Sequence, residues 1–189
     1  MTIGIYIDNN VWDFLYERDI DLSVALPREE FVICITREAE FEIPPIAATN
    51  SALAAFIATT INKCLIETDV FFGFNDDSLP PSEQREGGFN FGRFANPEEL
   101  AFMAQQRTPL KPRHSIKNLK TRLYKDEADI ALATRSFHAI VLSLDAKKGP
   151  INKAYQQGGK IVFLKDFDLS GMLLADFIRS KLTEHRGRH

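Results

Sequence analysis

The chain has 189 residues, 44% of them hydrophobic, and a formal net charge of −3. This length supports one sizeable core, so we expect a single domain over residues 1–189. The charge excludes a protein held on nucleic acid by bulk positive charge. No apolar run approaches the roughly 18 residues of a membrane span, so we expect a cytoplasmic protein without membrane contact. Cys34 and Cys64 lack metal-ligand spacing and are expected to be free thiols.

The first half of the chain predicts strands that alternate with helices. Residues 2–7 alternate β-branched and aromatic side chains, which is typical of a strand, and a helix should follow soon after Asp8. Residues 31–36 are almost continuously apolar, as expected of a parallel strand buried on both faces. Residues 51–67 carry an apolar stripe that repeats every four residues and therefore predict a helix.

The second half continues the alternation. Asn96, followed by proline and two acids, predicts the start of a helix that ends near Gln106. The later elements are expected as a helix at 126–137, a strand at 138–145, a helix at 149–159, a strand at 160–165 and a helix at 170–183. A strand, a helix and another strand of this length indicate a parallel crossover, and therefore an α/β fold.

A loop-rich insertion is expected between these halves, over about residues 70–115, where glycine, proline and charge dominate. It contains Phe89, Phe91 and Phe94 close to Arg93. These side chains could stack on unpaired bases, whereas the alternative is a surface loop anchored by its phenylalanines.

Four acidic residues stand at the ends of predicted elements. Asp8 and Asp145 each end a strand, Glu38 follows the second strand, and Asp129 opens a late helix. In an open α/β sheet such positions converge outside the carboxyl ends of the strands, where ligands bind. Carboxylates gathered there repel one another unless they share a cation. We therefore expect a catalytic site for Mg²⁺ or Mn²⁺, as in a metal-dependent nuclease.

Two of these positions have close alternatives. Asp126 lies three residues before Asp129 on the same helix face and is a further candidate metal ligand. Thr36 can cap a helix in which Glu38 and Glu42 share a face, so the sequence leaves open which of the two is the second acid.

Two segments resemble a known family. IYIDNNVWDFL is similar to the opening of PIN domains, small metal-dependent ribonucleases in which an aspartate ends the first strand. EADIALATRSFHAIVLSLDAKKGPINKAYQQGGKIVFL resembles the matching part of PIN and NYN nucleases, with an acid entering an alanine-rich helix and a strand that ends in Ser-x-Asp at Ser143 and Asp145. The resemblance covers about residues 2–43 and 124–166.

The resemblance implies a three-layer PIN-like domain, with a central parallel sheet, helices on both faces and an insertion in the middle of the chain. It implies an endoribonuclease that uses Mg²⁺ or Mn²⁺, with RNA, single-stranded or structured, as substrate. It also raises a toxin-like role with an antitoxin-like protein partner, and a homodimer. Asn9 and Ser143 are expected beside the substrate.

A basic segment precedes the acidic helix and could supply phosphate contacts, notably through Lys117, Lys120 and Arg122. The alternative is a solvated surface.

Other function classes remain open. A haloacid-dehalogenase phosphatase also places an aspartate after a strand, but Asn10 stands where its second aspartate belongs. A receiver domain would need an acidic pair that the sequence lacks. A catalytically inactive PIN-like scaffold that binds RNA or protein is the remaining alternative.

Overall fold

Five parallel strands form the single sheet of the computed structural model, which describes residues 2–77, 79–106, 118 and 120–186. The strands are β1 (Ile3–Ile7), β2 (Phe31–Thr36), β3 (Glu67–Asp69), β4 (Ile140–Ser143) and β5 (Ile161–Phe163). Their order across the sheet is β3-β2-β1-β4-β5, and every neighbouring pair is parallel. The expected α/β class with a parallel sheet is therefore confirmed.

Helices connect the strands in the described residues. They are α1 (Asn10–Glu17), α2 (Leu22–Ala25), α3 (Arg37–Thr49), α4 (Ser51–Cys64), α5 (Pro97–Gln106), α6 (Glu127–Arg135), α7 (Pro150–Gln156), α8 (Phe167–Ser170) and α9 (Leu174–Arg186), with short 3-10 turns at Pro81–Glu83 and Leu164–Asp166. None of the helices in the described part of the chain is both long and apolar enough to span a bilayer.

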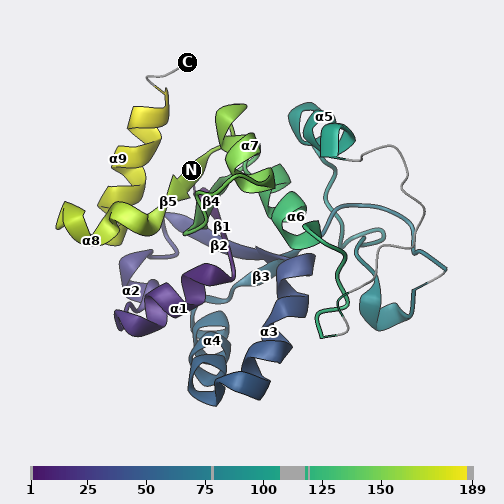
Figure 1. The fold of residues 1–189 in the computed structure, drawn as a ribbon, viewed down its shortest axis with the longest axis horizontal. Coiled ribbons are helices and arrows are strands. Elements are labelled where there is room, and N and C mark those ends of the chain that lie inside the picture. Colours follow the sequence, from purple (N-terminus) through teal and green to yellow (C-terminus); the bar gives the residue numbers. More distant parts are fainter. Residues whose placement is uncertain (1, 78, 107–117, 119, 187–189) are drawn as a thin grey trace.

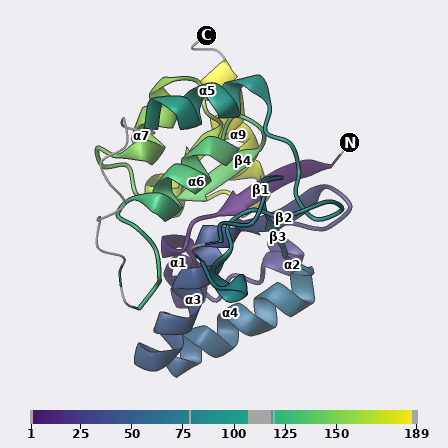
Figure 2. The same cartoon turned by 90° about the vertical axis from the view of Figure 1, so that its right-hand side faces the viewer.

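Strand β1 divides the core into two clusters because successive strand residues point to opposite faces. Ile5 and Ile7 belong to a cluster completed by α1, α2, α4 and α9, whereas Tyr6 belongs to one completed by α5, α6 and α7. Figure 1 shows α1 and α4 below the central strands and α6 and α7 above them. Figure 2 separates α3 and α4 from α5, α6 and α7 in the same way.

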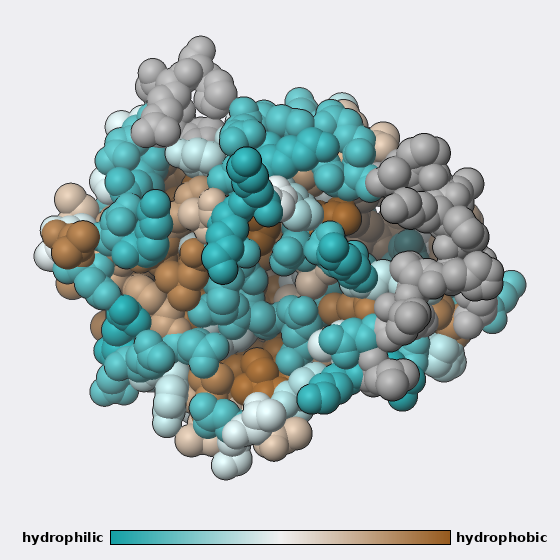
Figure 3. Space-filling model, viewed as in Figure 1, coloured by the Kyte–Doolittle hydropathy of each residue, from teal (hydrophilic) through white to brown (hydrophobic). Residues whose placement is uncertain are grey.

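The surface turned toward the viewer is mainly hydrophilic, with small apolar groups, one of them over α8 (Figure 3). Leu169 of α8 is 89% exposed. Cys34 and Cys64 are both free thiols, as expected.

Local sequence explains most element boundaries. Thr36 Oγ1 accepts a hydrogen bond from Ala39 N at 3.1 Å and so caps α3. Asn96 and Glu99 form a capping box at the start of α5, in which each side chain accepts from the other's backbone N–H at 2.8 Å. The expected helix start at Asn96 is thus confirmed.

Strand β3 and helices α2 and α8 were not expected from the sequence. The three residues of β3, Glu-Thr-Asp, are polar and too few to show a strand pattern, so only pairing with β2 defines the strand. Residues 70–77 and 79–96 follow it and form little regular structure. Isolated bridges join Phe71 to Arg93 and Phe72 to Gly87, which fold this segment back on itself.

An ion network centred on Asp69 attaches this segment to the sheet. Arg93 Nε donates to Asp69 Oδ1 at 3.0 Å, and Arg135 Nε donates to Asp69 Oδ2 at 2.8 Å. Arg93 also donates to the buried Glu99 at 2.9 Å. Both guanidinium groups lie over the ring of Phe71. One carboxylate at the end of β3 therefore holds residues 70–96, α5 and α6 together.

We predict that Asp69→Asn destabilises the protein by about 3 kcal/mol or more, since Arg135, only 2% exposed, would lose its carboxylate partner. Urea unfolding at pH 7 measures the change. Asp168→Asn, which removes a fully exposed partner of Arg18, is the control and should leave the unfolding midpoint nearly unchanged because water screens that pair. Equal midpoints for both variants would show that the Asp69 network contributes little.

Candidate active site at the carboxyl ends of β1 and β4

Asp8 follows β1, and hydrogen bonds hold it against the end of β4. Its backbone N–H donates to Leu142 O at 3.0 Å, which continues the ladder between the two strands. Its Oδ2 accepts from Ser143 Oγ at 2.5 Å and from Asn10 Nδ2 at 2.6 Å. Burial nevertheless raises the pKa of Asp8, and these hydrogen bonds only partly oppose the rise. Asp8 is thus a fixed carboxylate in a partly buried position.

Ser143 links Asp8 to Asp145. Its hydroxyl donates to Asp8 and accepts from the backbone N–H of Asp145 at 3.0 Å. Ser143 is fully buried. Asn10 supports the same arrangement, because its Oδ1 accepts from Leu144 N at 3.0 Å. Ser143 therefore positions the acids in this structure, although it was expected to contact substrate.

Asp129 stands in the field of three other carboxylates. Burial is the largest cause that raises its pKa to about 6, and the charges of Asp8, Asp126 and Asp145 raise it further. Asp126 precedes α6 in a left-handed conformation, and its side chain does not cap the helix. The structure thus brings Asp8, Asp126, Asp129 and Asp145 into one electrostatic neighbourhood.

Glu42, rather than Glu38, is the acid of α3 that belongs to this neighbourhood. Burial raises the pKa of Glu42, and the charge of Asp129 raises it as well. Asn9 Nδ2 donates to Glu42 Oε2 at 2.6 Å and to Ala39 O at 3.0 Å. Asn9, expected beside substrate, therefore ties Glu42 to the end of β1. We call Asp8, Glu42, Asp126, Asp129 and Asp145 the acidic edge.

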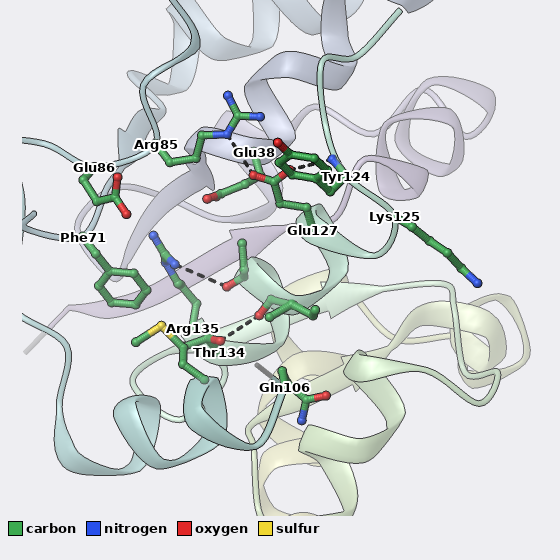
Figure 4. A pocket seen from close by; sticks show the side chains of 13 residues that line it. Glu38, Phe71, Arg85, Glu86, Gln106, Tyr124, Lys125, Glu127, Thr134 and Arg135 are labelled. Atoms are coloured by element: carbon green, nitrogen blue, oxygen red, sulfur yellow. Dashed lines mark hydrogen bonds and ion pairs between the residues drawn. The ribbon is translucent and has the colours of Figure 1, made fainter. Parts of the chain in front are cut away.

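Glu38 points elsewhere, contrary to our expectation that it would join the acids. The charged groups that act on it are Arg135, Glu127 and Arg85. Figure 4 shows Glu38 in a separate pocket with Arg85 and Tyr124. The two glutamates of α3 are four residues apart, or about 6 Å along the helix axis. That displacement is enough to place them in different environments, which the spacing of the sequence could not reveal.

The segment before α6 lies beside the acidic edge. Asn118, Thr121 and Lys125 line a shallow cavity of about 390 Å³ together with Glu42 and Asp126. Lys120 and Arg122 are exposed, and Arg122 Nε lies 3.9 Å from Glu83 Oε1. Lys117 lies outside the described residues.

The acidic edge offers only oxygen donors, which suit Mg²⁺ and Mn²⁺. Among the described residues, however, no three acidic, histidine or cysteine side chains are close enough together to hold an ion. The donor chemistry still fits Mg²⁺, because that ion keeps several waters and binds through one or two carboxylates. Asp8 and Asp129 are the pair that the electrostatics favours as ligands, with Glu42, Asp126 and Asp145 around them.

Comparison with known proteins adds no family assignment. The chain matches no protein-family model, no curated protein and no solved structure. The functional argument therefore depends on the geometry above and on the local resemblance of two sequence segments.

We predict that Asp129→Asn stabilises the metal-free protein at pH 7. Folding raises the pKa of Asp129 from 3.8 to about 6, so the folded state holds this proton more tightly. The wild type should therefore lose stability as pH rises from about 4 to about 6, and the penalty should persist above that range. Urea unfolding in EDTA at several pH values measures it.

The stability difference between Asp129→Asn and the wild type should shrink as pH falls toward 4, because Asp129 is then increasingly protonated in both the folded and the unfolded protein. Asp77→Asn, in the exposed loop before α5, is the control and should change stability little at any pH. A wild type that is more stable than Asp129→Asn at pH 7 would contradict the repulsion.

Proposed function

We propose that this protein is a Mg²⁺- or Mn²⁺-dependent nuclease that hydrolyses phosphodiester bonds of RNA. One observation carries the proposal: Ser143 joins Asp8 to Asp145 by hydrogen bonds at the carboxyl ends of β1 and β4, and the partly buried Asp129 is acted on by the charges of both and of Asp126. Repulsion of this kind costs stability, and a bound divalent cation would offset it.

The position of the acids supports the same conclusion. The strand order changes direction between β1 and β4, since the chain runs outward through β2 and β3 and then returns to the other side of β1. Ligands of open α/β sheets bind at this kind of switch point, outside the carboxyl ends of the strands. Asp8 and Asp145 follow the two strands that flank it.

In the proposed mechanism, Ser143 and Asn10 hold Asp8, and Asn9 holds Glu42, so these acids need little reorganisation when substrate arrives. Asp129, whose pKa burial and the neighbouring carboxylates raise to about 6, would be held ionised by the cation and so serve as a ligand. A divalent ion bound there would lower the pKa of the attacking water and offset charge on the phosphate. Lys125, on the cavity wall beside Glu42 and Asp126, is placed to attract a phosphate.

The PIN-like architecture belongs to this proposal. The resemblance implies a three-layer domain with an insertion, and the two core clusters and the loop-rich residues 70–96 are consistent with it. RNA, rather than DNA, follows only from the resemblance, as do the toxin-like role with its antitoxin-like partner and the homodimer. The cytoplasmic location is instead an expectation from the lack of a long apolar run in the sequence.

The exposed phenylalanines favour single-stranded RNA as the substrate form. Phe89, Phe91 and Phe94 are each at least 77% exposed. Phe72 holds Phe89 and Phe94 through ring contacts at 5.0 and 4.9 Å. Aromatic faces that are presented in this way can stack on splayed bases of any identity. Arg93 is committed to Asp69 and Glu99, so it supports the loop.

An inactive scaffold that binds RNA is the second candidate. The specific observation in its favour is that, in the described residues, no three acids stand close enough together to hold a metal. The phenylalanine surface would serve a scaffold equally well. Cleavage in the presence of Mn²⁺ separates the two functions, since a scaffold binds RNA and leaves it intact.

We predict that Asp8→Asn and Asp145→Asn each lower Mn²⁺-dependent RNA cleavage by about 100-fold or more. Loss of about 3 kcal/mol of transition-state stabilisation gives a change of this size. Cleavage of a labelled single-stranded RNA at saturating Mn²⁺ measures it. Asp13→Asn, an exposed substitution on α1, should retain wild-type cleavage. Full cleavage activity in both Asp8→Asn and Asp145→Asn would contradict the proposed site.

We also predict that Phe91→Ala weakens binding of single-stranded RNA by about five-fold or more if its ring stacks on a base. Phe91 is 84% exposed, so the urea midpoint should hardly change. Fluorescence anisotropy with a labelled RNA measures the affinity. Leu169→Ala, which trims an exposed apolar residue on α8, is the matched control. A large stability loss with unchanged affinity would make Phe91 an anchor of the loop.

A further inference from the structure

A second cavity, distinct from the acidic edge, lies between α3, α6 and the loop residues before α5. Its volume is about 460 Å³, within the range of small-molecule sites. Its wall includes Glu38, Arg85, Glu86, Tyr124, Ile130 and Arg135 (Figure 4). Asp8, Asp129 and Asp145 do not line it. We call this space the Glu38 cavity.

Two polar groups of this cavity have incomplete hydrogen bonding among the described residues, the acceptor Oε2 of Glu38 and the donor Nε2 of Gln106. Glu38 is only 9% exposed, and its Oε2 is buried without a hydrogen-bond partner among the described residues. A buried carboxylate oxygen in this state is costly, because it has given up its hydrogen bonds to water without replacement. A ligand that donates hydrogen bonds to Glu38 would remove that cost after a small rotation of the side chain.

The two arginines of the wall are already committed. Arg85 Nε donates to Glu127 at 2.8 Å, and another of its nitrogens donates to Arg122 O at 2.6 Å. Arg135 Nε donates to Asp69 at 2.8 Å. Apart from Gln106 and Lys125, the wall therefore offers few available donors, whereas Glu38 requires a ligand that itself donates hydrogen bonds.

The remaining wall suits a flat ring. Tyr124 and Ile130 contribute apolar surface, and Met103 and Ala131 add to it. Unpaired bases are commonly bound in such pockets, with one face against an aromatic ring and the polar edge against a few side chains.

The hydrogen-bonding groups along the polar edge of a base determine which base fits Glu38. Guanine presents two adjacent donors, the ring N1–H and the exocyclic amine, which match the two oxygens of a carboxylate. Adenine and cytosine each place a ring acceptor beside their amine, and uracil flanks its single N–H with two carbonyls. Glu38 would accept two hydrogen bonds only from guanine, and a bidentate contact discriminates by about 1 to 3 kcal/mol, or roughly five-fold to more than a hundred-fold.

The Glu38 cavity is connected to the acidic edge. Tyr124 and Lys125 line both this cavity and the shallow cavity that contains Glu42 and Asp126. Glu38 and Glu42 lie about 6 Å apart along the axis of α3. A nucleotide could therefore place its base beside Glu38 while its phosphate lies at the acidic edge.

We propose that the Glu38 cavity binds a guanine base next to the scissile phosphate and gives the enzyme a preference for cleavage beside guanine. The proposal rests on the proposed nuclease function for its role in cleavage, whereas guanine binding itself can be measured without metal or catalysis.

Isothermal titration of the full chain in EDTA with GMP, AMP, CMP and UMP tests the binding. GMP should bind at least about ten-fold more tightly than the other three. Glu38→Gln should lose this preference, because its amide presents a donor where guanine needs an acceptor. Glu98→Gln, an exposed substitution on α5 outside the cavity, should keep it. If Glu38→Gln fails to fold, Met103→Trp, which fills the cavity, should also abolish GMP binding.

Equal affinity for the four nucleotides, or an unchanged preference in folded Glu38→Gln, would overturn the proposal. Mn²⁺-dependent cleavage of an RNA that contains all four bases then separates the two claims. Cleavage without any preference for guanine would contradict the guanine pocket and support the nuclease function. A preference for GMP without any cleavage would support the guanine pocket and contradict the nuclease function.

Discussion

Parallel pairing of β1 with β4 is the constraint on which the candidate site depends. The register aligns Ile5 to Ile7 with Ile140 to Leu142, and Asp8 extends the ladder by one more hydrogen bond to Leu142. Segments separated by more than 130 residues in sequence thus end side by side, with Asp8 after one strand and Ser143 at the end of the other. Asn10 and Ser143 then join the two ends through side-chain hydrogen bonds. A shift in this register would separate the acids.

The fold leaves carboxylates close to one another at the acidic edge, whereas a carboxylate elsewhere is neutralised by arginines. At the end of β3, Asp69 is paired with two arginines, which attaches residues 70–96 to the core. At the acidic edge, burial and then the charges of three carboxylates raise the pKa of Asp129. Structural ion pairs and functional sites both shift pKa values, but they differ in whether opposite charge is supplied. Asp69 has two arginine partners, so we regard it as a structural residue. Among the described residues, Asp129 has only carboxylates as charged neighbours, so we propose it as a functional one.

The sequence predicted the strands that carry strong apolar patterns and the helices with clear caps, such as the strand over residues 31–36 and the helix that starts after Asn96. It also placed Asp8, Asp129 and Asp145 at one sheet edge, because topology alone determines where strand ends meet. It could not separate Glu38 from Glu42, since both lie on one helix face and only the packing of α3 against α6 distinguishes them. It missed β3, whose polar residues form a strand only through pairing, and gave no sign that Ser143 and Asn9 position acids.

Location of bound manganese tests the central claim most directly. Crystals of the protein soaked in MnCl₂ should show an anomalous-scattering peak beside Asp8 and Asp129, with the carboxylates of the acidic edge turned toward it. The peak should be absent in crystals of Asp8→Asn treated in the same way. No peak at the carboxyl ends of β1 and β4 in the wild type, or a peak only at another place on the protein, would contradict the account.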